Sequence, residues 1–208
     1  MYTTNNIRKP HSQFEFRRIS FLRRAIILAL TIALVAASTF AQQKQERKPP
    51  KDVITNLILV DQNGKRIDFY NDLVKGRVVA INFIYTTCAS ICPMQGNQFA
   101  RLQAMLGDRL GKDVLLISIS ADPETDSPQK LKAWLSNYGA NQGWTFVTGE
   151  KSEIDRLSRA LTGDQARTGY HSPVLFIGNY DKGLWKRVYG LAEPERLTRM
   201  IVDMTAEQ

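Results

Sequence analysis

Residues 86–93 read Thr-Thr-Cys-Ala-Ser-Ile-Cys-Pro and contain the only two cysteines of the 208-residue chain. An apolar run over residues 78–85 precedes them, and an apolar pattern with helical spacing follows over residues 93–110. This order predicts a strand, a loop that carries two thiols, and a helix. Pro93 suits the first position of that helix, where its missing N–H group costs nothing. The positive end of such a helix would lie beside the thiols and favour their thiolate forms.

The spacing of the two cysteines also predicts chemistry. Cys88 and Cys92 are four residues apart, and residues four apart lie one above the other in a helical turn, so both sulfurs can point the same way. The alternative interpretation is a pair of inert, buried cysteines. Buried cysteines rarely occur as a lone close pair beside a proline-initiated helix, so we interpret this pair as functional.

The rest of the chain alternates between strand and helix patterns. Strands are predicted over residues 57–60, 65–69, 78–85, 113–120, 144–147, 174–177 and 184–189. Helical segments are predicted over residues 71–75, 93–110, 128–138, 152–161 and 193–204, with Ser127 and Ser152 as N-caps and Pro128 at the first position of its helix. Alternating strands and helices followed by a hairpin predict an α/β sandwich with helices on both faces of the sheet.

The positive charge of the chain is concentrated at its amino terminus. The net charge is +8, and residues 1–24 carry six basic side chains against one acidic one, whereas residues 25–41 carry none of either sign. The remainder has a net charge of only +3 and no basic stripe. This distribution argues against a nucleic-acid partner.

The same amino-terminal pattern is typical of an exported protein. A basic segment followed by an uncharged run predicts a signal peptide or an amino-terminal membrane anchor over residues 1–41. Thr39-Phe40-Ala41 fits a cleavage site, but the 17-residue run over residues 25–41 is also near the lower limit for a membrane span. The long basic region favours the uncleaved anchor. Residues 42–52 are predicted to be a linker and residues 53–208 a folded domain on the periplasmic side of the cytoplasmic membrane, where a close cysteine pair is redox-sensitive.

One histidine accompanies the cysteine pair. From residue 42 onward the chain holds only His171, in a loop before the strand predicted at residues 174–177. Two thiolates and an imidazole suit copper, whereas a closed structural zinc site would normally require a fourth protein ligand. A single histidine is more often a surface residue, so His171 becomes a ligand only if its loop reaches the dithiol.

Three further side chains are candidate site residues. Met94 could supply a soft extra ligand, but core packing is the expectation for it. Asp122 and Asp126 could form a carboxylate pair, but their setting favours turn and helix-cap roles.

Four segments together resemble the Sco/SenC family, the copper-handling proteins of cytochrome c oxidase assembly. They are residues 82–93, residues 118–128, residues 143–149, and His171-Ser172. The resemblance covers about residues 53–205 and implies a thioredoxin-like fold with a central mixed sheet. It also implies that Cys88, Cys92 and His171 are ligands of copper, as Cu(I) or Cu(II).

Two departures from the family pattern bear on these expectations. Family members often have an aspartate before the histidine, where this chain has Tyr170, so a charge-balancing group is missing. Pro173 stands just before a strand, as does the cis-proline that faces the dithiol in thioredoxin-like reductases. This position keeps a redox function open.

The resemblance implies a copper metallochaperone. Its partners would be the copper-binding subunit of a cytochrome c oxidase and an upstream copper donor or thiol reductant. The alternative is a thiol–disulfide oxidoreductase that reduces the cysteine pair of that subunit before metal insertion. The three-residue spacer favours the chaperone, because reductases of this fold usually have two residues between the cysteines. A peroxidase of this fold would need a reactive cysteine of low pKa supported by a threonine and an arginine. Thr87 is adjacent to Cys88, but no arginine follows before Arg101, so a peroxidase is disfavoured.

Overall fold

The computed structural model describes residues 49–163 and 173–206. The expected signal or anchor, most of the expected linker, Tyr170 and His171 lie outside the described residues. The strands are β1 Ile58–Asp61, β2 Arg66–Asp68, β3 Val78–Ile84, β4 Val114–Ser120, β5 Trp144–Thr148, β6 Val174–Asn179 and β7 Leu184–Tyr189. The helices are α2 Lys51–Thr55, α3 Ile91–Leu106, α4 Pro128–Ser136, α5 Lys151–Thr162 and α6 Pro194–Ala206, with a π-helical turn at Phe69–Val74 and a 3₁₀ turn at Gly107–Arg109.

The strands form one sheet in the order β2-β1-β5-β4-β3-β6-β7. Strands β3, β4 and β5 run parallel to one another, whereas β1 lies antiparallel to both β2 and β5, and β6 lies antiparallel to both β3 and β7. The prediction of a central mixed sheet is therefore confirmed. β3, which leads into the cysteine loop, is flanked by neighbours on both sides.

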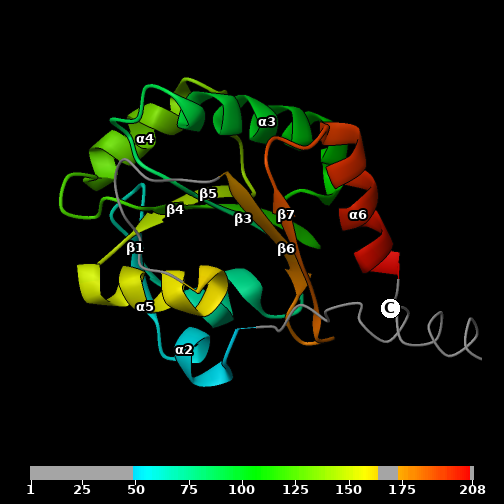
Figure 1. Ribbon diagram of the computed structural model, residues 1–208, viewed down its shortest axis with the longest axis horizontal. Coiled ribbons are helices and arrows are strands. Elements are labelled where there is room, and N and C mark those ends of the chain that lie inside the picture. The colour runs from blue at the N-terminus through cyan, green and yellow to red at the C-terminus, as the bar shows by residue number, and fades with distance from the viewer. Residues whose placement is uncertain (1–48, 164–172, 207–208) are drawn as a thin grey trace, which may run out of the picture. The chain divides into compact units, whose positions relative to one another are not determined.

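Helices cover both faces of the sheet, as predicted (Figure 1). One core contains residues of α3, α4 and α6 together with Val78, Ala80 and Ile84 of β3. The other contains residues of α2 and α5 together with Val79 and Ile81 of β3. Because successive strand residues point to opposite faces, a nearly continuous apolar strand supplies both cores.

The starts of two helices differ from their predicted positions. α3 begins at Ile91, so Cys92 is already helical and Pro93 is the third helical residue rather than the first. The first turn tolerates this proline because its N–H groups have no partner within the helix. α5 begins at Lys151 after Glu150, so the expected cap at Ser152 is wrong. The Ser127 cap is confirmed, since its hydroxyl accepts a hydrogen bond from the Lys130 N–H group at 3.4 Å.

A close contact fixes how α3 lies against the chain after α4. A Cβ atom on Gly96 would lie 2.5 Å from Cζ of Tyr138, so only glycine allows the tyrosine ring to rest on α3 here. The Tyr138 ring in turn lies 4.4 Å from that of Trp134, measured between centroids. This contact places an aromatic cluster beside the amino-terminal half of α3, which carries Cys92.

Candidate metal centre

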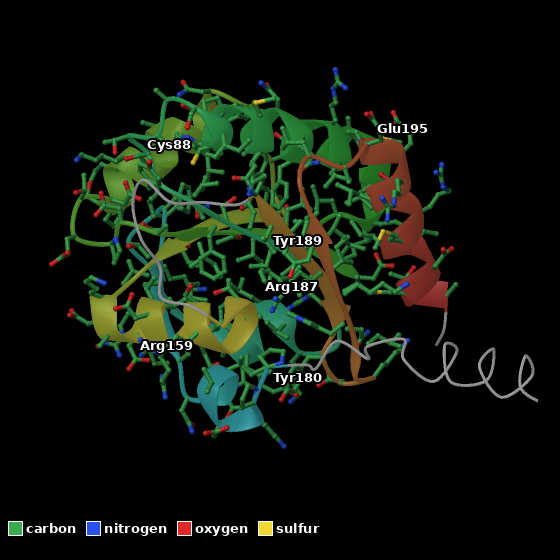
Figure 2. All side chains as sticks on the ribbon, viewed as in Figure 1. Cys88, Arg159, Tyr180, Arg187, Tyr189 and Glu195 are labelled. Atoms are coloured by element: carbon green, nitrogen blue, oxygen red, sulfur yellow. The ribbon has the colours of Figure 1, made fainter. Side chains whose placement is uncertain are left out.

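The two thiols lie where β3 passes into α3. Cys88 is in the connecting loop and is 7% exposed, while Cys92 is in the first turn of α3 and is fully buried. Neither forms a disulfide. Figure 2 shows Cys88 beside the layer formed by α3 and α4. The carboxyl end of a parallel strand is a common place for sites in α/β proteins, so this location agrees with a functional role.

The loop, not a helical turn, brings the sulfurs together. Cys88 precedes α3, so the expectation that both cysteines share a helical turn is wrong. A tight turn instead folds the loop back, with the Cys88 N–H group donating to the Tyr85 carbonyl at 3.2 Å. Within this loop the Cys88 sulfur lies 3.7 Å from the Ser90 hydroxyl.

The two thiols have opposite acidities. Burial alone would raise the pKa of Cys88, but hydrogen bonds from the Cys92 thiol and from the Cys92 and Ser90 backbone N–H groups lower it to about 6. Burial raises the pKa of Cys92 to about 12, and its hydrogen bond to Cys88 acts in the same direction. The pair therefore carries one thiolate, on Cys88, and one thiol, on Cys92, at neutral pH.

This difference in acidity predicts selective alkylation. In the reduced protein we expect iodoacetamide to modify Cys88 with a rate that rises through an apparent pKa of about 6, because the thiolate is the nucleophile. Cys92 should stay unmodified up to at least pH 9, since its pKa is raised to about 12. Mass spectrometry of peptides alkylated between pH 4 and pH 10 (~1-unit steps) measures both rates. Modification of Cys92 before Cys88 would contradict the assignment.

Asp126 lies beneath the cysteine loop. Its carboxylate is 1% exposed and accepts hydrogen bonds from the Thr86 N–H group at 3.1 Å and the Thr86 hydroxyl at 2.5 Å. The predicted helix-cap role of Asp126 is therefore wrong, because Ser127 caps α4. The Asp122 carbonyl closes the turn by accepting from the N–H groups of Thr125 and Asp126, which agrees with its predicted place in a turn.

The structure also corrects the expectation for Met94. This side chain is 53% exposed and does not pack in the core. It follows Cys92 by two positions in α3, and residues two apart in a helix do not face each other. Although the Met94 side chain is exposed, its position in the helix does not favour it as a ligand of the dithiol site.

His171 lies outside the described residues, but the chain that follows it is described. β6 begins at Val174, and its Leu175 pairs with Asn82 near the end of β3. The Pro173 carbonyl accepts a hydrogen bond from the Gly190 N–H group at 2.8 Å. Among the described residues no three His, Cys, Asp or Glu side chains are grouped to hold a metal ion.

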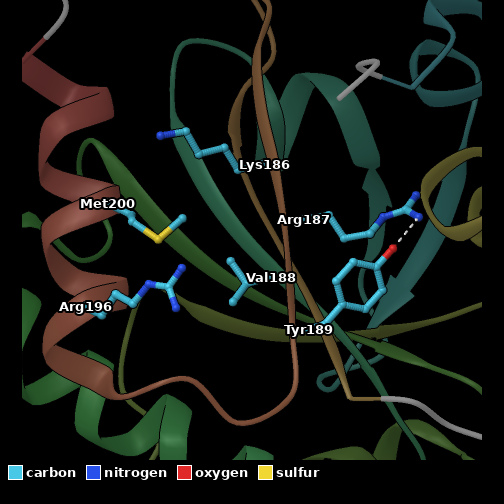
Figure 3. Close-up of a pocket in the computed structure, with 6 residues that line it drawn as sticks. All are labelled: Lys186, Arg187, Val188, Tyr189, Arg196 and Met200. Carbon is cyan, nitrogen blue, oxygen red and sulfur yellow. Dashed lines mark hydrogen bonds between the residues drawn. The ribbon is translucent and has the colours of Figure 1, made fainter. Parts of the chain in front are cut away.

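A groove between β7 and α6 has a different chemistry (Figure 3). It encloses about 600 Å³ and is lined by Lys186, Arg187, Val188, Tyr189, Arg196 and Met200. Three cationic side chains and no thiol line it, so it does not resemble a site for a soft metal ion.

Comparison with known proteins identifies the family. The SCO1/SenC family model matches residues 45–205, which include the whole sheet and the cysteine loop. The chain belongs to the SCO1/SenC family. A relative from Stutzerimonas stutzeri that is named for copper binding is 35% identical over 149 residues, which cover 69% of this chain and 71% of the relative.

Solved structures of SCO1/SenC proteins share the fold. BsSco, described as a cytochrome c oxidase assembly protein with a disulfide switch, aligns with a TM-score of 0.65 and 25% identity over 80% of this chain and 100% of its own. ScoI of Bradyrhizobium japonicum, solved with copper bound, aligns with a TM-score of 0.58 and 25% identity over 71% and 96% of the two chains. The thioredoxin-like α/β fold expected from the sequence is confirmed.

Sequence reasoning missed two side chains of this SCO1/SenC site. Asp126 was assigned to a cap, although the alternation of Ser118 and Ser120 in an otherwise apolar strand marks a polar end of β4 that could receive it. Tyr138 was treated only as a helix end. Burial raises its pKa, and the charges of Cys92 and Cys88 raise it further, which places the phenol within electrostatic range of the thiols.

No helix in the described part of the chain is long and apolar enough to span a membrane.

Proposed function

We propose that this protein is a copper metallochaperone that delivers copper to a cytochrome c oxidase copper centre during assembly. The observation that carries the proposal is the pair of free thiols at the end of β3, one of them strongly acidified, in a SCO1/SenC chain. Copper is the cargo of the protein. Two similar proteins support this proposal: ScoI of Bradyrhizobium japonicum was solved with copper bound, and BsSco is a member of a family of cytochrome c oxidase assembly proteins.

The donor set fits copper. We propose Cys88, Cys92 and His171 as the protein ligands, because thiolate sulfur and imidazole nitrogen are soft and borderline donors that suit this metal. His171 is three residues from Val174, so the extended chain limits their separation to about 11 Å. Val174 begins the strand next to β3, and its neighbour Leu175 pairs with Asn82, so β6 starts at the end of the sheet that carries the cysteine loop.

The acidities of the two thiols suit loading and release. The Cys88 thiolate is available to bind copper at neutral pH without losing a proton. Cys92 must lose its proton when copper binds, so binding is coupled to proton release. Return of that proton would favour transfer of copper to the copper-binding subunit of the oxidase. An upstream donor or reductant would supply copper or keep both sulfurs reduced.

A second candidate function is thiol–disulfide exchange, favoured by the low pKa of Cys88. The Cys88 thiolate would attack a disulfide of the oxidase subunit and form a mixed disulfide, releasing one thiolate of the partner. Cys92, after losing its proton, would attack Cys88 and release the second. The partner would gain two electrons and leave a Cys88–Cys92 disulfide behind.

We also propose the domain organisation and location predicted from the sequence. Residues 1–41 would be a signal peptide or membrane anchor and residues 42–52 a linker, and residues 53–208 would function on the periplasmic side of the cytoplasmic membrane. α2 begins at Lys51, so regular structure starts two residues before the proposed start of the domain at residue 53. The peptide bond between Ser172 and Pro173 lies outside the described residues.

Anaerobic copper titration tests the chaperone function. We expect one copper per reduced chain, because the described residues offer one pair of thiols. Cu(II) loading should produce a thiolate-to-copper absorption band, and a thiol count made in parallel should show two free thiols before loading. A fully reduced protein that binds no copper would exclude the chaperone and leave the oxidoreductase.

A further inference from the structure

The Asp126 carboxylate links the neighbouring ends of strands β3 and β4 next to the cysteine loop. Its Oδ1 atom accepts hydrogen bonds from the N–H group and the hydroxyl of Thr86, at 3.1 and 2.5 Å. Its Oδ2 atom accepts a hydrogen bond from the Ser120 hydroxyl at 2.6 Å. Because Ser120 ends β4 and Thr86 is the second residue of the loop after β3, one carboxylate fixes the position of the loop relative to the sheet.

Among the residues that the structure describes, no cation pairs with this buried carboxylate. The ion pairs there are Arg109–Asp113, Lys151–Asp155 and Arg156–Glu153. The nearby Lys130 ammonium donates instead to the Thr125 carbonyl at 2.9 Å. Hydrogen bonds from neutral donors stabilise a buried carboxylate, but they leave its net charge in place.

The charge of Asp126 acts on the dithiol. Thr86, which Asp126 holds, is two residues before Cys88. Cys92 lies in the first turn of α3, the helix that the same loop enters. A fixed negative charge is therefore within electrostatic range of the atoms proposed to hold copper.

We propose that the buried carboxylate of Asp126 biases the Cys88–Cys92 site towards Cu(II) over Cu(I). This inference rests on the proposed copper function. With the same protein ligands, the two loaded forms differ by one unit of charge, and a fixed negative charge stabilises the more positive form. Asp126 is not a ligand. It acts through its field and through the Thr86 loop, as a positioning residue.

The variant Asp126→Asn removes the charge and keeps the shape. The Oδ1 atom of the asparagine can still accept hydrogen bonds from Thr86. Its NH₂ group can donate to the Ser120 hydroxyl, which then accepts a hydrogen bond instead of donating one. Charges within a few Å shift acid–base equilibria by about 1–3 pKa units. Because Asp126 acts through the Thr86 loop and not as a ligand, we take the lower end of this range and expect the ratio of Cu(II) to Cu(I) affinities to fall about tenfold.

Competition titrations of the reduced full-length chain with chelators specific for Cu(I) and for Cu(II) measure the two affinities separately. The Cu(II)/Cu(I) reduction potential of the bound copper is an independent readout. A tenfold fall in the ratio of Cu(II) to Cu(I) affinities raises this potential by about 59 mV. Ser120→Ala is the matched control. It removes one hydrogen bond to Asp126 but keeps the charge and both Thr86 contacts, so the ratio should not fall.

The outcomes separate the inference from the function on which it rests. If the unmodified chain binds neither ion, the copper function fails and the inference fails with it. If the chain binds copper but Asp126→Asn leaves the affinity ratio unchanged, only the inference fails, because the carboxylate then merely holds the loop. If Asp126→Asn does not fold, as judged by circular dichroism, Thr86→Val takes its place. Thr86→Val removes a hydrogen bond that partly offsets the negative charge of Asp126, so the ratio of Cu(II) to Cu(I) affinities should rise. An unchanged or lower ratio overturns the inference.

Discussion

Replacing Cys92 with serine should abolish stoichiometric copper binding by the reduced protein, and we expect the same effect from Cys88→Ser. Each change removes one of the two proposed sulfur ligands, and a hydroxyl is a hard, weakly acidic donor that does not replace a thiolate for copper. Loss of an outer-shell partner typically costs about 10–100-fold in metal affinity, so loss of a ligand should cost more than that. Titration with copper, followed by the thiolate-to-Cu(II) band and by metal analysis, measures the loss.

Ser90→Ala is the matched control for these two variants. The Ser90 hydroxyl lies 3.7 Å from the Cys88 sulfur, so this change alters the same loop but removes no proposed ligand. Copper binding should stay within about tenfold of the unmodified protein, since one net hydrogen bond contributes only about 0.5–1.5 kcal/mol. Thermal unfolding of the copper-free variants shows whether the serine buried at position 92 destabilises the fold. Full copper loading by either cysteine variant would refute the assigned ligands.

The fold could be predicted largely because β3 and β4 have simple sequence patterns. Val78–Ile84 and Val114–Ser120 are short and mostly apolar, and they occupy the centre of the sheet with helices on both faces. Their burial on both sides needs no polar alternation, so the pattern alone specifies a central position. The start of α3 was misplaced by two residues because a proline is tolerated at several positions of the first turn, not only at the first.

The site was less predictable because its supporting side chains come from distant segments. Cys88 and Asp126 are far apart in sequence, and only the parallel pairing of β3 and β4 brings the residues after those strands together. Ile84 pairs with Ser120, so Thr86 and Asp126 follow neighbouring strand ends. A lone sequence shows two aspartates in a turn, but it does not show which one points inward. The sequence likewise does not indicate that Gly96 permits the close approach of Tyr138.

His171→Ala should separate copper binding from disulfide exchange. Exchange requires only the two sulfurs, with an acidified Cys88 and a resolving Cys92. A copper site with three protein ligands loses one of them, so we expect copper affinity to fall by at least about tenfold, the lower limit typical of outer-shell changes. Oxidase assembly in cells should fall with it, while the rate at which the reduced pair cleaves a model disulfide should stay within about twofold.

The measurement combines three readouts on the same variant: a copper competition titration, a disulfide-reduction assay and oxidase activity in cells. His11→Ala, which removes the only other histidine of the chain, is the matched control and should change none of them. The three readouts distinguish the two proposed functions because only copper delivery depends on the imidazole as a ligand. If His171→Ala binds copper normally, His171 is not a ligand. If oxidase assembly survives while copper binding is lost, delivery is not the function that the oxidase requires, and the dithiol acts on the oxidase subunit by reducing its cysteine pair.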